Sequence, residues 1–194
     1  MIYTPRISNY KPFYIQIGSQ DAIDLIGAPY YIIVKSPDYP PYKVKEPYKN
    51  DWLDEHGDEE YIASSGLYVE AFSLNLECAM FAIGDQGQTE EQLIANLNAR
   101  LRAFRENLRA AGFFKIYDSF TGFGFKDVRL EEFPTPDAEN YSVTSKAALS
   151  QSGGSLVKTR VGDRVRLIFT VTLKVNDPVT QMVYDAGSLD IVEA

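Results

Sequence analysis

The sequence contains very few of the residues that catalysis and metal binding use most. Among 194 residues there is one histidine, His56, and one cysteine, Cys78. A catalytic triad built on histidine also needs a matched nucleophile and an orienting acid, and the sequence offers no such set. A single cysteine excludes a disulfide within the chain, and the strand pattern around Cys78 predicts a buried, reduced thiol. We therefore expect no catalytic site, no metal site and no cofactor.

Long apolar runs and clusters of basic residues are missing as well. No segment approaches the roughly 18 apolar residues of a membrane span, and the first residues do not resemble a signal segment. The formal net charge is −8 and the pI is about 4.7. Because binding to nucleic acid depends on clustered Lys and Arg, we expect no specific binding to DNA. An acidic surface would still let DNA pass. We expect a protein that is made and folded in a cytoplasm and has no membrane contact.

Three local patterns suggest chemistry, but a structural role explains each of them better. The acidic stretch 51–60 (DWLDEHGDEE) lacks the ligand spacing of a calcium loop, so a solvated loop is expected. Residues 122–126 (GFGFK) lack the spacing of a phosphate-binding loop, and glycines that allow tight packing at a strand start fit better. Arg102, Arg105 and Arg109 share one side of a helix pattern. They could form an anion patch, although a solvated helix face is the favoured interpretation.

The clearest patterns belong to one long strand and one long helix. Residues 67–82 alternate between apolar and polar side chains, which predicts a half-buried strand. Thr89 has the character of an N-cap, with Gln92 at the capping-box position, and Gly112 is the expected end of the helix. The helix carries one apolar stripe at 4-4-3-4 spacing, made of Leu93, Leu97, Leu101, Phe104 and Leu108.

The remaining patterns predict a β-rich chain with one domain and an elaborated arm. Strands are expected at residues 13–17, 30–34, 113–117, 123–133 and 164–175. The predicted fold class is α+β, a sandwich or barrel-like antiparallel or mixed sheet with one long helix packed on it. An extended, proline-rich N-terminal arm completes it. We expect an arm with an acidic loop over residues 1–60 and a core over residues 61–194. Residues 134–160 are poor in large apolar side chains, which predicts a long loop within that core.

Several segments together resemble tail proteins of bacteriophages. The stretch PPYKVKEPYKNDWLDEHGDEEYI, Pro40 to Ile62, resembles tail proteins encoded by Bacteroidetes phages and prophages. A strand that closes on a Gly-Asp turn before a helix ending in Ala-Gly resembles the distal-tail and tail-tube type of fold. The segments KIYDSFTGFGFKDVRL and TLKVNDP do so too. The resemblance spans about residues 40–178. The predicted loop at 134–160 departs from a compact tail domain.

The resemblance implies a structural virion protein without enzymatic activity. In such proteins a sheet closes across subunits into a barrel around the DNA channel, with the helix outside. The expected partners are further copies of the chain in a ring, most often sixfold, and neighbouring tail proteins. DNA would pass through without specific binding. The expected location is the virion tail, assembled in the cytoplasm of the host bacterium. The candidate assembly contacts are Tyr42, Tyr48, Trp52, Tyr68 and Phe169.

The lengths of two strands give a physical reason to expect a neighbour. Residues 67–82 and 164–175 are longer than usual strands, and their apolar alternation runs throughout. A helix of about 33 Å leaves part of such a surface uncovered, so a second subunit is expected to cover the rest. Two other functions stay open. One is a small-molecule-binding domain or enzyme, which needs a pocket with convergent polar groups. The other is a carbohydrate-binding module, suggested by the 13 tyrosines.

Overall fold

The fold is built around two long antiparallel strands. The computed structural model describes residues 11–50, 59–61, 68–83, 88–152 and 155–194. Strand β10 (Ser155–Asp177) pairs with β6 (Phe72–Ile83) from Arg164↔Ile83 to Val175↔Phe72 with no shift in register. Because side chains alternate along a strand, this register puts the apolar rows of both strands, Phe72 to Ala82 and Val165 to Val175, on one face. The expected long strands are confirmed.

Further strands extend this pair into an eight-stranded sheet in which all pairings are antiparallel. The strand order is β2-β1-β7-β8-β10-β6-β3, and β9 pairs with the first part of β10. β9 and β8 therefore both lie beside β10, one after the other. The added strands are β1 (Phe13–Ile17), β2 (Ile23–Asp24), β3 (Ile32–Asp38), β7 (Phe113–Asp118), β8 (Gly124–Glu132) and β9 (Tyr141–Ser152).

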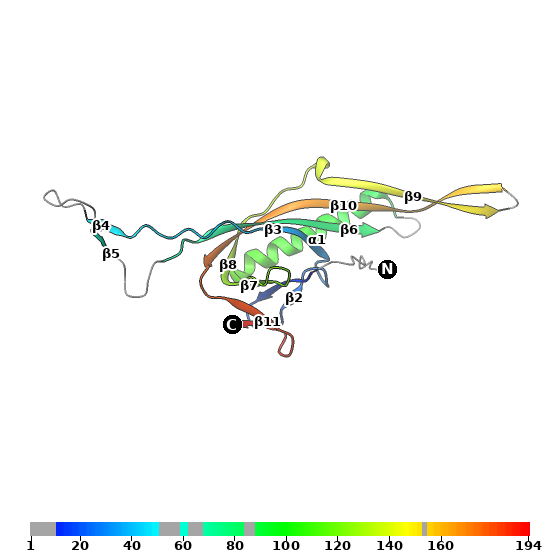
Figure 1. Cartoon of the computed structure of the whole chain (residues 1–194). Coiled ribbons are helices and arrows are strands. Elements are labelled where there is room, and N and C mark those ends of the chain that lie inside the picture. Colours follow the sequence, from blue (N-terminus) through cyan, green and yellow to red (C-terminus); the bar gives the residue numbers. More distant parts are fainter. Residues whose placement is uncertain (1–10, 51–58, 62–67, 84–87, 153–154) are drawn as a thin grey trace.

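Helix α1 (Glu90–Ala111) covers one face of this sheet, as Figure 1 shows. Both halves of its predicted capping box are formed between Thr89 and Gln92. The predicted apolar stripe is buried along its whole length against the sheet. Arg100 donates to the carbonyl oxygen of Phe81 at 2.7 Å, which ties the helix to β6. The predicted α+β fold, one long helix on a β-rich sheet, is confirmed. Of the helices within the described residues, none is long and apolar enough to cross a membrane.

A C-terminal hairpin of β11 (Met182–Asp185) and β12 (Asp190–Glu193) covers part of the opposite face. The rings of Tyr14 and Tyr184 stack with centroids 3.9 Å apart. Buried Gln16 donates to the Asp190 carboxylate at 2.7 Å and accepts the backbone N–H of Ile191 at 2.9 Å. At Gly124 an added Cβ would lie 2.3 Å from the carbonyl oxygen of Met182. That glycine is therefore required where β8 meets the hairpin, as its predicted packing role implied.

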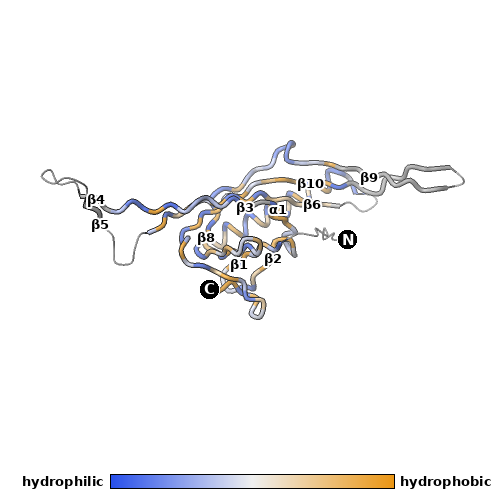
Figure 2. The backbone as a smooth tube through the Cα atoms, in the orientation of Figure 1, coloured by the Kyte–Doolittle hydropathy of each residue, from blue (hydrophilic) through white to orange (hydrophobic). Residues whose placement is uncertain are grey.

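Two projections leave the body in opposite directions (Figure 1). One is the arm between β3 and β6, which carries the paired strands β4 (Tyr48–Asn50) and β5 (Glu59–Tyr61). Its stem is held by the pairing of Val44 with Val69. The other is the hairpin formed by β9 and the first part of β10. Apolar segments gather around α1, whereas the arm is largely hydrophilic (Figure 2).

Two of the predicted boundaries are wrong. Residues 134–160 do not form one long loop, because a 3-10 turn (Ala138–Asn140), β9 and the start of β10 lie within them. Residues 1–60 are not an arm throughout, because β1, β2 and β3 belong to the main sheet. The extended arm begins after β3. Its predicted proline-rich and extended character holds for the described residues 39–50, which contain only a short strand.

Truncating the buried stripe of α1 should destabilise the fold. Leu97 has 0% of its surface exposed, and truncating a buried leucine typically costs about 2–5 kcal/mol. We expect Leu97→Ala to lower the free energy of unfolding by that amount in urea denaturation followed by circular dichroism. Arg102→Ala, an exposed position on the same helix, should change it by less than about 0.5 kcal/mol. Equal losses at both positions would contradict the observed orientation of the helix.

Candidate assembly interface

The stem of the arm presents exposed aromatic side chains. Backbone hydrogen bonds of 2.7 Å join Lys45 N–H to the Tyr68 carbonyl and Glu70 N–H to the Lys43 carbonyl. Tyr42 is 53% exposed and Tyr68 is 60% exposed. The Tyr42 ring meets Phe72 edge to face, with centroids 6.1 Å apart, so its position is fixed where the arm joins β6. Large aromatic side chains held in place at the surface are typical of the contacts that anchor protein interfaces.

The other three candidate contacts have different outcomes. Phe169 is only 3% exposed and packs within the core near Phe133, so its prediction as an assembly contact is wrong. It lies on the inward row of β10, where β6 and α1 already cover it. Tyr48 belongs to β4 on the arm. Trp52 lies outside the described residues, as does His56.

The expectation that a neighbour must cover the long strands is also wrong. The six inward residues of β10 are all 3% exposed or less in the single chain. Not only α1 but also the curled sheet itself, through β1, β3, β7 and β8, contributes to the same core. These six residues are Val165, Leu167, Phe169, Val171, Leu173 and Val175. Any assembly must therefore use surfaces other than the apolar face of these strands.

The opposite face of β6 and β10 is largely polar, as the alternation predicts, although Ala79, Phe81 and Ile168 also lie on it. The hydroxyl of Thr172 donates to the Asn75 amide oxygen at 2.9 Å, and Lys35 pairs with Glu77. This face, called the outer face below, carries three basic side chains and one acidic side chain along these two strands. Its polar and charged members are Ser73, Asn75, Glu77, Arg164, Arg166, Thr170, Thr172 and Lys174. A sheet face with this composition is suited to contact with water.

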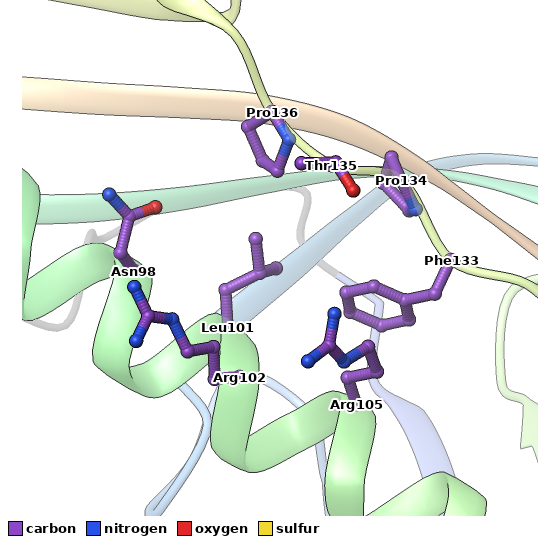
Figure 3. Close-up of a pocket in the computed structure, with 8 residues that line it drawn as sticks. All are labelled: Asn98, Leu101, Arg102, Arg105, Phe133, Pro134, Thr135 and Pro136. Carbon is purple, nitrogen blue, oxygen red and sulfur yellow. The ribbon is translucent and has the colours of Figure 1, made fainter.

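A groove on α1 is formed by residues that are far apart in sequence. The segment 133–136 crosses over it (Figure 3). Its helix side is formed by Asn98, Leu101, Arg102 and Arg105. Its volume is about 210 Å³. A wider, more open depression continues from Asn98 and Arg102 toward Glu91. Arg109, the third arginine of the sequence pattern, does not line either of them.

The two arginines of this groove differ in their partners. Arg105 forms an ion pair with Glu106 at 3.2 Å, and Arg109 binds the other oxygen of Glu106 at 2.8 Å. The hydrogen bond from Arg109 holds the pKa of Glu106 below its ordinary value. Arg102 has no ion pair with any residue that the structure describes. The groove thus offers one uncompensated guanidinium group and a second that is partly compensated, beside apolar walls.

Side chains capable of chemistry are engaged in structural roles. Burial raises the pKa of the Cys78 thiol, which keeps the sulfur neutral and unreactive. The buried carboxylate of Asp118 accepts from the Phe120 backbone at 2.9 Å, the Thr121 hydroxyl at 2.8 Å and the Tyr39 hydroxyl at 3.1 Å. Burial, and then the Asp118 charge, raises the pKa of Tyr39. Within the described residues, no group of three or more His, Cys, Asp or Glu is placed to hold a metal ion.

Comparison of the sequence with known protein families finds no match, and comparison with curated proteins finds no relative. The features that bear on function are therefore the arm, the outer face and the groove, together with the sequence resemblance to phage tail proteins.

Asp118 should prove to be a structural residue. Its removal breaks three partly buried hydrogen bonds to the carboxylate, and one hydrogen bond to a charged group typically contributes about 1.5–3 kcal/mol. We expect Asp118→Ala to lower the free energy of unfolding by at least that amount. The exposed control Asp21→Ala should change it by less than about 0.5 kcal/mol. Unchanged stability in Asp118→Ala would contradict the role assigned to this turn.

Proposed function

We propose that this chain is a structural subunit of a bacteriophage or prophage tail that assembles into a ring of identical subunits around the DNA channel. The observation that carries this proposal is the pair of projections on opposite sides of a body whose core is already complete. Segments that bury little surface in their own chain gain stability when they lie against another subunit. The exposed aromatic residues of the arm stem fit the same role.

The outer face supports an orientation within the ring. In this arrangement the polar face of β6 and β10 lines the channel and α1 lies on the outside. Along these two strands the face carries Arg164, Arg166 and Lys174 against Glu77, so DNA in the channel would meet a small basic surplus, which salt screens. The acidic surplus of the chain is concentrated elsewhere, above all in residues 51–60. The position of the subunit in the tail is that of a tail-tube, distal-tail or terminator protein. Such a protein assembles in the bacterial cytoplasm and contacts neighbouring tail proteins.

The alternatives would use a pocket. Pockets that enclose a drug-sized ligand usually measure about 300–1,000 Å³. The groove of about 210 Å³ on α1 is smaller, and the depression of about 470 Å³ beside it is lined by α1 alone and is open, so it does not enclose a ligand. This makes a small-molecule enzyme or binding module the weaker proposal.

The mass of the protein in solution tests the ring. A sixfold ring of 21.8 kDa subunits has a mass of about 131 kDa, and negative-stain images should show a central opening. Changing both Tyr42 and Tyr68 to Ala should leave a folded protein with less ring, because these side chains are exposed in the single chain. Phe120→Ala, an exposed aromatic on another turn, is the matched control and should keep the ring. A chain that stays monomeric at high concentration, also with the neighbouring tail proteins, contradicts the proposal.

A further inference from the structure

We infer that the groove on α1 receives the acidic tip of the arm, residues 51–60, from a neighbouring copy of the same chain. The inference rests on the proposed ring and identifies the contact that would join its subunits. Two features of the groove require a particular partner. Its side chains supply guanidinium groups, which bind carboxylates well. Its walls are apolar, formed by Leu101, Phe133, Pro134 and Pro136, and suit an aromatic or aliphatic side chain.

The tip has the complementary composition. Its sequence, DWLDEHGDEE, contains six acidic residues, no Lys or Arg, and the only tryptophan of the chain, Trp52. Trp52 is followed by Leu53 and stands between Asp51 and Asp54. A tryptophan beside carboxylates matches an apolar pocket beside arginines, and Trp and Arg are both enriched among the residues that dominate interface energies. The groove is large enough for one such side chain and too small for most whole ligands.

The geometry of the arm favours a groove on another subunit. Strands β4 and β5 pair at the end of the arm that lies away from α1 (Figure 1). The pairing of Asn50 with Glu59 holds the two ends of the tip together. Its eight intervening residues can reach about 14 Å beyond this pair, since four residues lead out and four lead back. The stem from Tyr39 to Asn50 spans about 36 Å at 3.3 Å per residue. The tip therefore cannot return to the groove of its own chain.

The charges of the groove favour an acidic partner. Arg102 has no ion-pair partner among the described residues, and Glu106 compensates Arg105 only in part, because Glu106 also binds Arg109. Carboxylates of a neighbouring subunit would form ion pairs with both guanidinium groups. The chain has a net charge of −8, so an acidic segment is repelled by the molecule as a whole. The two arginines of the groove attract such a segment locally.

A charge exchange tests the contact in the full-length protein. Reversing the groove (Arg102→Glu with Arg105→Glu) and reversing the tip (Asp54→Lys with Glu55→Lys) should each raise the concentration of half-assembly at least about tenfold. Combining all four changes in one chain restores opposite charges, so assembly should return to within about threefold of the original. Lys11→Glu with Arg129→Glu changes the net charge as much as the groove variant does, at exposed positions outside the groove, and should assemble normally. Circular dichroism checks that each variant is folded.

Trp52 supplies a second, independent measurement. Because it is the only tryptophan, its fluorescence reports on the tip alone. On assembly its emission should shift to shorter wavelength as the indole leaves water, and the shift should be absent in the reversed-groove variant at the same concentration. Salt at about 1 M, where the Debye length is about 3 Å, should weaken assembly.

The outcomes separate this inference from the proposed function. Rings that form equally well in all charge variants, with no change in Trp52 emission, overturn the groove contact and leave the ring proposal standing. Reversed variants that both lose assembly without rescue in the combined chain also overturn the contact, because the two sites then act separately. An original chain that never assembles overturns both proposals. Loss in each reversed variant, rescue in the combined one and a normal control support the contact.

Discussion

The uninterrupted register between β6 and β10 is the constraint on which the rest of the structure depends. Twelve consecutive residue pairs, from Arg164↔Ile83 to Val175↔Phe72, fix which side chains face α1 and which face water. A slip of one residue would exchange the two faces, so burial of the inward row strongly selects this register. The position of the helix, the polar outer face and the directions of both projections all follow from it. The arm leaves from the start of β6, and the β9–β10 hairpin continues β10 beyond its pairing with β6.

Elements with strong periodicity could be predicted from the sequence. The capping box at Thr89, the stripe on α1 and the alternation in β6 and β10 each depend on spacing within one segment. Elements without a buried face could not be predicted in this way. The segment 141–160 is poor in large apolar side chains and its hairpin projects from the body, so the alternation that marks a half-buried strand is missing. Sequence patterns also fail to place the short strands β1 to β3 in the main sheet, because nothing in one segment shows which distant strand it pairs with.

The candidate contacts also differ in exposure, according to which row of the sheet or arm they belong to. Tyr42 and Tyr68 are exposed where the arm begins, whereas Phe169 is buried because its row faces α1. The groove shows the limit of sequence patterns most clearly. Arg102, Arg105 and Arg109 form one series at helical spacing, but only the first two line the groove. These two arginines line the groove because the segment 133–136 forms its other wall, and that segment lies some 30 residues further along the chain. A pocket formed across such a separation leaves no local signal.

The completeness of the core changes the physical argument for assembly. Had the apolar rows of the long strands been left open, a neighbour would be needed for the fold itself, as in obligate dimers whose monomers are unstable. Because β6 and β10 are already covered, a subunit of this kind can fold first and assemble later through its projections. In the proposed ring, a contact made by the arm tip would cover a small area and depend on charge, so each one would be weak and sensitive to salt. A closed ring would repeat this contact around its circumference and hold every subunit at two places, by its own arm and by its neighbour's. Weak contacts that become stable only on closure allow misplaced subunits to leave, which suits a structure that must assemble with one defined symmetry.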